Sequence, residues 1–247
     1  MTSVVDLAKL ANAVYDDVLS VGEWSRVGQP FTEHASTFKA ALYQNRQTTD
    51  FSLAIAGTKA LGDLGSDVQL AIGRTPAQYR MARTAFASSR GLSGGLVDFY
   101  MAGHSLGGGL VSMLGKEYGY PTVTFNAPGM ARAFSHLESN EPGLNATRDD
   151  DRKVLHICAV FDLVSRGTGA HMGAEGSVER VSTGAVGAGS FVAGALGAAL
   201  SVVNPLLGAA AAGLAATAAT GLKAHSMDRM VATLENLPRY NEDLDWV

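Results

Sequence analysis

The sequence predicts an α/β fold in which a mostly parallel central sheet is flanked by helices. Short apolar runs rich in β-forming residues alternate with segments whose apolar residues recur at helical spacing. Strand, helix and strand in succession form the unit from which parallel sheets are built. The chain has 247 residues, of which 47% are hydrophobic, and this is enough to bury one substantial core. We therefore predict a single domain over residues 1–247.

The first part of the chain is expected to supply a helix, two strands and a second helix. Residues 3–18 carry their apolar side chains on one helical stripe and predict an amphipathic helix. Residues 38–43 fit a helix and a strand about equally, whereas residues 51–56 predict a buried strand. Residues 75–90 open on a Thr-Pro pair, which is a good N-cap and first turn, and predict a helix that leads back to the sheet.

Residues 96–115 predict a strand, a tight turn and a helix, with Ser105 at the turn. A serine there is held in a strained backbone conformation, and a Cβ at Gly103 or Gly107 would collide with the neighbouring strand or helix. The Ser105 hydroxyl then stands above the end of the sheet. The amide of Leu106, at the positive end of the following helix, can face an oxyanion. A second Gly-x-Ser-x-Gly match at residues 91–95 follows a predicted helix and is interpreted as a helix-ending loop.

The second part of the chain continues the alternation of strands and helices. Residues 121–125 predict a strand, residues 130–137 a short helix and residues 139–151 a polar surface loop. Residues 153–161 predict a strongly apolar strand, and Asp162 follows directly from its end. In hydrolases with a serine at such a turn, the acid follows the nucleophile at a strand terminus and the histidine comes last.

Two segments carry a resemblance to a known family. Gly103-His-Ser-Leu-Gly-Gly, followed by Thr122-Val-Thr-Phe-Asn-Ala-Pro-Gly129, resembles the lipase class 3 family of α/β-hydrolases. The similarity extends upstream to Phe51-Ser-Leu-Ala-Ile-Ala-Gly57-Thr58 with Gly62-Asp63, and downstream to Asp162 and His225. It leaves residues 166–222 unmatched. The resemblance implies an α/β-hydrolase fold, a strand at residues 38–43 that pairs with the next one, and serine-dependent hydrolysis of carboxylic esters of lipids.

The expected catalytic residues are Ser105 as nucleophile, Asp162 as acid and His225 as base. Asp162 lies 57 residues after Ser105, and His225 lies 63 residues after Asp162. Among the six histidines, His171 is the competitor, because its glycine-rich loop follows the acid. We favour His225 because it begins a segment with one apolar helical face, which can hold a base firmly while letting it move. Matched to the family, Thr58 supplies the second oxyanion donor beside Leu106.

Residues 181–222 contain no charged side chain and are dominated by Ala, Gly, Val and Leu. This segment could be a buried helical hairpin, an apolar lid or cap over the ester site, or a hairpin that inserts into a membrane. We favour a lid or acyl-binding cap, because the segment lies between the acid and the base in the sequence. Two alternative functions follow: a membrane-active toxin or effector that uses this hairpin, and a small-ester esterase or thioesterase.

Composition limits the other function classes. The formal net charge is −4 with a sequence pI near 5.8, and no Lys/Arg cluster occurs, so we expect no nucleic-acid partner. The three adjacent carboxylates at residues 149–151 lack the spacing of a metal loop, and we expect neither metal nor cofactor. The single cysteine, Cys158, is expected in the core. Asp6 and Lys9 interrupt any N-terminal export signal, so we expect a cytoplasmic protein or one exported by a signal-less route.

Overall fold

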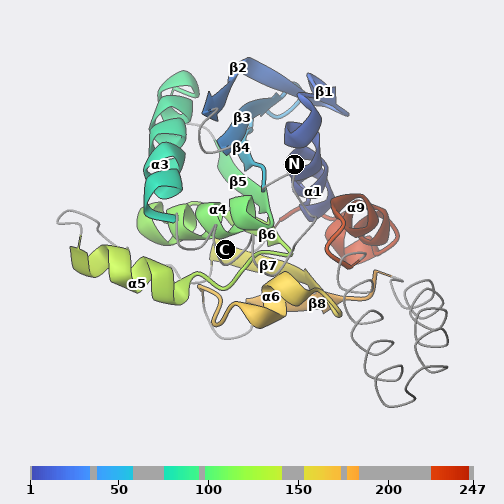
Figure 1. Ribbon diagram of the computed structural model, residues 1–247. Helices are drawn as coiled ribbons and strands as arrows, with labels where there is room; N and C mark the ends of the chain where they lie inside the picture. Colours follow the sequence, from blue (N-terminus) through green and yellow to red (C-terminus); the bar gives the residue numbers. More distant parts are fainter. Residues whose placement is uncertain are drawn as a thin grey trace, which may run out of the picture.

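The structure is a computed structural model that describes residues 2–33, 38–57, 75–94, 98–140, 153–173, 177–183 and 224–244. At its centre lies an eight-stranded sheet whose strands follow one another in sequence order (Figure 1). The strands are β1 (Ser20–Val21), β2 (Trp24–Glu33), β3 (Phe38–Asn45), β4 (Phe51–Ile55), β5 (Phe99–His104), β6 (Thr122–Phe125), β7 (Val154–Ala159) and β8 (Val178–Val181). Strands β1 to β4 pair antiparallel, and β4 to β8 pair parallel.

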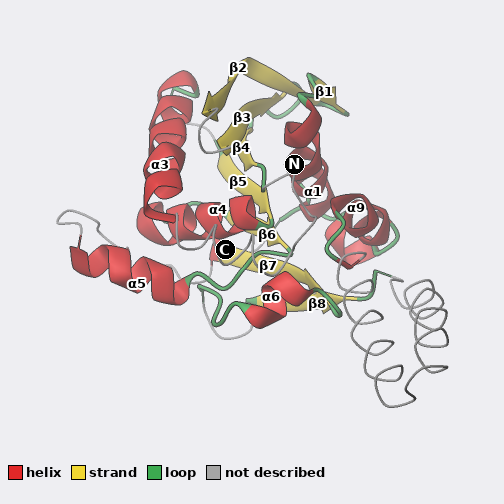
Figure 2. Cartoon of the chain, viewed as in Figure 1, coloured by secondary structure: helices red, strands yellow, loops and turns green. Residues whose placement is uncertain are grey.

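Helices cover both faces of the sheet (Figure 2). They are α1 (Val4–Ala13), η1 (Val14–Asp16), α3 (Thr75–Leu92), α4 (Leu106–Tyr118), α5 (Ala131–Asn140), α6 (Leu163–Gly167), α9 (Met227–Glu235) and η3 (Pro238–Tyr240). Apolar side chains of α1 and α9 pack against one face of the sheet, and those of α3, α4 and α5 pack against the other. The two apolar layers bury nearly every inward side chain of the central strands, which explains why these strands are continuously apolar.

The register of the parallel strands places four strand ends at one edge of the sheet. Ile55 pairs with Gly103, His104 with Phe125, and Phe125 with Ile157. The residues that follow β4, β5, β6 and β7 therefore leave the sheet side by side. In open α/β sheets, ligands bind outside the carboxyl ends of the strands, so the chemistry is expected at this edge.

Most elements predicted from the sequence are confirmed. The first helix, the strands over 51–56, 121–125 and 153–161, and the helices around residues 75–90 and 130–137 are present. Residues 38–43 form a strand that pairs antiparallel with the next one, as the resemblance implies. The predicted α/β fold, a mostly parallel central sheet flanked by helices, is confirmed.

The sequence did not predict the strands β1, β2 and β8 or the short helices α6 and η3. Strand β2 is half-exposed along most of its length, and β8 reads Val-Glu-Arg-Val, so neither shows the apolar run by which a buried strand is recognised. Helix α6 spans only five residues, too few for a helical period to show. These elements are stabilised mainly by contacts with neighbouring elements of the fold and not by a local sequence pattern.

The uncharged segment over residues 181–222 was expected to form a lid or acyl-binding cap. Residues 184–223, and with them nearly all of the uncharged segment over 181–222, lie outside the described residues. The single-domain organisation over residues 1–247 therefore stays a prediction. Within the described ranges, no helix is both long enough and apolar enough to cross a bilayer.

Two glycines allow β4, β5 and α4 to approach one another closely. A Cβ on Gly103 would lie 2.6 Å from the carbonyl oxygen of Gly107, and a Cβ on Gly107 would overlap the carbonyl oxygen of Ile55. The obstructing atoms are backbone and cannot move aside. The steric prediction made from the sequence for both glycines is confirmed.

Replacing Gly107 by alanine is expected to destabilise the protein by about 1–3 kcal/mol, the usual cost of overpacking a well-packed interior. The matched control is Gly91→Ala in α3, where a Cβ meets no atom within 4 Å and alanine favours the helix. Urea unfolding followed by circular dichroism measures both variants. Equal unfolding free energies for the two variants would contradict the steric argument.

Candidate active site

Ser105 occupies the sharp turn between β5 and α4. Its backbone angles are φ 54° and ψ −130°, a conformation that is unfavourable for a residue with a Cβ. The Ser105 N–H donates to the carbonyl oxygen of Phe125 at 3.0 Å, and its carbonyl accepts from Gly109 at 3.1 Å. The side chain is buried, with 4% of the residue exposed. The neighbouring strand and the first turn of α4 thus hold the strained turn in place.

The end of β4 lies directly against this serine. A Cβ on Gly57 would sit 2.7 Å from the Cβ of Ser105 and 2.8 Å from the carbonyl oxygen of His104. The loop that begins at Gly57 therefore starts beside the candidate nucleophile, where a second oxyanion donor is needed. Thr58, the predicted donor, lies outside the described residues. Leu106, the other predicted donor, is the first residue of α4, so its amide belongs to the positive end of that helix.

Asp162 and His225 meet at the same edge of the sheet. His225 Nδ1 donates to Asp162 Oδ1 at 2.6 Å, and the two residues are 1% and 0% exposed. The second carboxylate oxygen of Asp162 accepts the Ser165 N–H at 2.7 Å, which makes Asp162 the N-cap of α6. Burial opposes ionisation of Asp162, but the hydrogen bonds from His225 and Ser165 outweigh it and hold the pKa of the carboxyl below its usual value.

The other ring nitrogen of His225 is available for proton transfer. Because Nδ1 carries the hydrogen given to Asp162, Nε2 of the neutral ring is an acceptor. This atom is buried and has no hydrogen-bond partner among the described residues. A buried acceptor without a partner is costly unless a reacting group occupies the position.

His104 links the turn to the segment that carries His225. Its ring lies 4.7 Å from the His225 ring, centroid to centroid, and its Nε2 is 2.8 Å from the carbonyl oxygen of His225. A carbonyl only accepts, so Nε2 carries the hydrogen and Nδ1 accepts from the Tyr15 hydroxyl at 2.8 Å. His104 thus hydrogen-bonds to Tyr15 on one side and to the main chain of His225 on the other. Tyr15 was expected only on the buried stripe of the first helix, and its hydroxyl also accepts the Gly57 N–H at 2.8 Å.

The competing histidine, His171, does not pair with Asp162 but contacts Ser165 and His156. Its Nε2 donates to the carbonyl oxygen of Ser165 at 3.0 Å, and its ring lies 4.7 Å from that of His156, centroid to centroid. His156 itself is a core residue, and its ring is held between Thr124 and the carbonyl of Met172. The structure thus pairs Asp162 with His225 and brings both to the edge where Ser105 stands.

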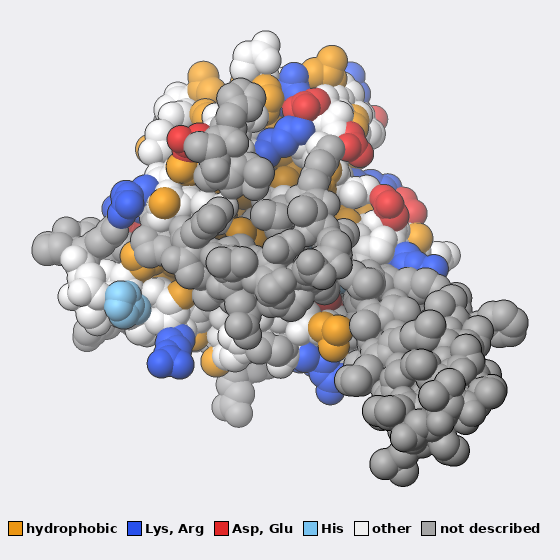
Figure 3. All heavy atoms as spheres, in the orientation of Figure 1, with side chains coloured by type: hydrophobic (Ala, Val, Ile, Leu, Met, Phe, Trp, Pro, Cys, Tyr) orange, Lys and Arg blue, Asp and Glu red, His pale blue; other side chains and the backbone are white. Residues whose placement is uncertain are grey.

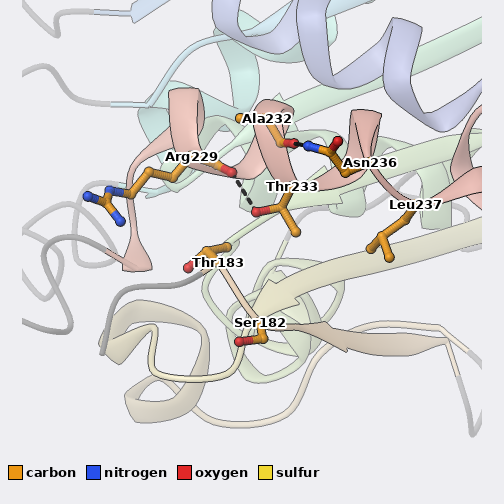
Figure 4. A pocket seen from close by; sticks show the side chains of 7 residues that line it. All are labelled: Ser182, Thr183, Arg229, Ala232, Thr233, Asn236 and Leu237. Carbon is orange, nitrogen blue, oxygen red and sulfur yellow. Dashed lines mark hydrogen bonds between the residues drawn. The ribbon is translucent and has the colours of Figure 1, made fainter. Parts of the chain in front are cut away.

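A groove of about 610 Å³ lies between the end of β8 and helix α9 (Figure 4). The hydroxyl of Thr233 and the side-chain amide of Asn236 each donate to a carbonyl of helix α9. The Arg229 side chain points away from the other lining residues. None of the candidate catalytic residues lines this groove. Within the described ranges, no group of three or more His, Cys, Asp or Glu side chains is arranged to hold a metal ion.

Comparison with known families identifies the chain. The family model described as phospholipase-like, Tle-like phospholipase domain, matches residues 6–156, which is more than half of the sequence. The chain belongs to the Tle-like phospholipase domain family. The matched region contains the Ser105 turn and ends within β7, so it precedes both Asp162 and His225.

Shorter matches connect this family member to curated proteins. It is 38% identical over 96 residues to the extracellular phospholipase A1 of Serratia liquefaciens, covering 39% of this chain and 29% of that protein. It is 51% identical over 49 residues to the putative lipase ATG15 of Candida albicans, covering 19% of this chain and 8% of that protein. The chain thus spans less than a third of the length of these relatives.

Solved structures similar to this member of the family include two fungal lipases. The triacylglycerol lipase of Penicillium expansum matches with a TM-score of 0.49 and 14% identity over 72% of this chain and 77% of that chain. The Lip2 lipase of Yarrowia lipolytica matches with a TM-score of 0.43 and 17% identity over 66% of this chain and 71% of that chain.

The buried histidines predict a loss of stability in mild acid. Burial lowers the pKa of His104 to about 3 and that of His156 to about 4, from the usual 6.5 of a histidine. Below pH 6.5 the unfolded chain binds protons that the folded protein does not, so stability present at neutral pH is lost as the pH falls towards these folded values. For His156, the loss between about pH 7 and about pH 5 is about 2 kcal/mol.

Urea unfolding at the two pH values tests this for wild type and His156→Gln. Between the two pH values, His156→Gln should lose less unfolding free energy than the wild type. A control substitution at the exposed His136 should lose as much as the wild type. An identical pH dependence in wild type and His156→Gln would show that His156 does not stay neutral in the fold.

Proposed function

We propose that this chain is a serine ester hydrolase that acts on lipid esters, as a lipase or phospholipase, through Ser105, Asp162 and His225. One observation carries the proposal: a buried 2.6 Å hydrogen bond joins Asp162 to His225 at the edge of the sheet where Ser105 is held in a strained turn. Three residue types in the order required by this reaction class support the same conclusion.

In the first half of the proposed reaction, His225 Nε2 takes the proton of the Ser105 hydroxyl as Oγ attacks the ester carbonyl. The amide of Leu106, with a donor at Thr58, stabilises the oxyanion that forms on the carbonyl oxygen. The protonated His225 then gives its proton to the leaving alcohol, which departs and leaves an acyl group on Ser105. Asp162 orients the imidazole and stabilises its cationic form.

In the second half, water replaces the alcohol. His225 removes a proton from water, the hydroxide attacks the acyl-enzyme, and the carboxylic acid leaves as Ser105 regains its proton. The low pKa of Asp162 supports this role, because the carboxyl stays ionised through both halves of the cycle.

Lipid esters are the proposed substrates for two reasons. The family is phospholipase-like, and the named relatives are a phospholipase A1 and a putative lipase. In addition, Phe161 and Leu163 flank Asp162 with 42% and 41% of each residue exposed, which places two apolar side chains beside the candidate acid. Other hydrophobic side chains reach the surface at separate places on the face drawn in Figure 3. We propose that Phe161 and Leu163 contact the lipid surface or the acyl chain.

Ser105→Ala and Asp162→Asn are expected to abolish most ester hydrolysis. Loss of the nucleophile lowers kcat by about 10⁶ in hydrolases of this kind, and loss of the group that fixes the imidazole tautomer lowers it by about 10⁴. Activity on short and long acyl esters measures the effect, and a fluorophosphonate probe should label the wild type at Ser105. His225→Ala should be similarly inactive.

The matched control is Ser93→Ala, which changes the serine of the second Gly-x-Ser-x-Gly sequence. Ser93 lies just after α3 and donates to the carbonyl oxygen of Arg90, away from the candidate triad. This variant should retain activity and fluorophosphonate labelling. Full activity in Ser105→Ala would exclude the proposed mechanism, and bilayer leakage that persists in that variant would favour the membrane-active alternative through residues 181–222.

Replacing both Phe161 and Leu163 by serine is expected to reduce hydrolysis of phospholipid vesicles about tenfold or more. Full burial of an exposed apolar side chain contributes about 1.5–3 kcal/mol, and 42% and 41% of these two residues is still exposed and can be buried by lipid. Hydrolysis of a water-soluble ester should change little. Leu92→Ser is the control, because Leu92 is 58% exposed at the end of α3, which leads back to the start of β5 at the opposite edge of the sheet. Equal loss on soluble and vesicle substrates would rule out a role in lipid contact.

A further inference from the structure

We propose that Asn126 and His104 are positioning residues that hold the main chain of His225 by two successive carbonyl groups. Asn126 Nδ2 donates to the carbonyl oxygen of Ala224 at 2.9 Å, and His104 Nε2 donates to that of His225 at 2.8 Å. The two side chains come from the ends of the adjacent parallel strands β6 and β5. This inference rests on the proposed function, because it assigns His225 as the base.

Asn126 connects the strand that leads to the acid with the segment that carries the base. Its side-chain Oδ1 accepts the Ala159 N–H at 2.8 Å, while its Nδ2 binds Ala224. Ala159 is the last residue of β7, three residues before Asp162, and Ala224 directly precedes His225. One buried amide group therefore sets the separation of the two main-chain segments that present Asp162 and His225.

The residue type fits this role closely. A carboxamide carries an acceptor and a donor on the same short side chain, so it can join an N–H to a carbonyl. Asn126 is fully buried and has φ 48°, a left-handed conformation that asparagine tolerates better than most residues. Its own N–H donates to the carbonyl oxygen of Ile157 at 2.9 Å, which fixes the backbone from which the side chain projects.

His104 adds the second point of attachment. Burial lowers its pKa to about 3, so the ring stays neutral and keeps one donor and one acceptor nitrogen. The donor holds the carbonyl of His225, and the acceptor is satisfied by Tyr15, which also holds Gly57. The main chain of the base is thus tied to the turn of the nucleophile and, through Tyr15, to the start of the loop after β4.

These contacts restrict how far the imidazole can move during catalysis. Asn126 and His104 hold the main-chain carbonyls of residues 224 and 225, and Asp162 holds Nδ1 of the His225 ring. The main chain and the ring of His225 are therefore both restrained, which fixes the direction in which Nε2 points. Preorganisation of this kind affects the rate of the chemical step more than substrate binding, and a misplacement of about 1 Å can cost about 10²-fold.

Two variants of Asn126 separate its donor from its acceptor. Asn126→Asp keeps the oxygen that accepts from Ala159 but places a second oxygen, without hydrogen when ionised, against the Ala224 carbonyl. Asn126→Gly removes both bonds and accepts the positive φ without strain. Both should lower kcat for a soluble ester about 10–100-fold while KM changes less than about threefold.

A matched pair at His104 tests the second attachment. In His104→Gln, the side-chain amide can reach the position of Nε2 and still donate to the His225 carbonyl. In His104→Asn, the amide reaches only the position of Nδ1, which faces Tyr15 and not His225. We expect His104→Gln to retain at least about tenfold more kcat than His104→Asn, although both lose a buried ring.

Stability and the geometry of the Asp162–His225 pair are measured beside the kinetics. Thermal unfolding measures the stability of the two variants in each pair. Proton NMR follows the hydrogen between Asp162 and His225, and we expect its resonance to broaden in Asn126→Asp and His104→Asn. If Asn126→Asp fails to fold, Asn126→Gly and the His104 pair still decide the question. Wild-type kcat in Asn126→Gly, or equal kcat in the two His104 variants, would overturn the proposal.

These outcomes are distinct from failure of the proposed function. If Ser105→Ala is inactive and the Asn126 and His104 variants keep wild-type kcat, the serine hydrolase stands and the positioning role is excluded. If Ser105→Ala is fully active, the hydrolase mechanism itself is wrong, whatever the other variants show.

Discussion

The buried hydrogen bond between Asp162 and His225 is the constraint on which the site depends. A carboxylate and an imidazole with almost no exposure are unfavourable unless they pair, and the pairing joins the end of β7 to a segment 63 residues later. That segment continues into α9, whose apolar side chains Met227, Met230 and Leu234 pack in the same core layer as α1. The N-terminal helix thereby supports the base.

Polar contacts between α1 and α9 also hold the two helices together. Asn12 on α1 donates to Asp228 in the first turn of α9 at 2.9 Å, and Lys9 forms an ion pair with Glu235 at its other end, also at 2.9 Å. Exposed pairs of this kind contribute little free energy but fix the register of helices that already pack. Since α1 is followed by Tyr15, the same helix also orients the hydroxyl that contacts His104 and Gly57.

Site residues whose position depends on neighbours in the sequence could be predicted, whereas those whose position depends on residues distant in the sequence could not. The turn at Ser105 was predictable because its strand, glycines and helix are neighbours in the chain, and Asp162 because it ends an apolar strand. Asn126 was named only within the motif that carries the family resemblance, since its partners lie 33 and 98 residues away and nothing adjacent to it indicates them. The role of Tyr15 could not be predicted for the same reason, because its partner His104 is 89 residues away. Thr58 lies outside the described residues and stays a prediction.

The buried surroundings of the site select which groups carry charge. Burial lowers the pKa of His104 and His156 to about 3 and about 4, and it also lowers that of His171, so all three stay neutral near pH 7. Asp162 is held ionised by its hydrogen bonds. An imidazolium formed on His225 would therefore face one carboxylate and no competing histidine cation. Charge interactions are strong where water is excluded, and the surrounding histidine rings serve there as fixed hydrogen-bonding groups.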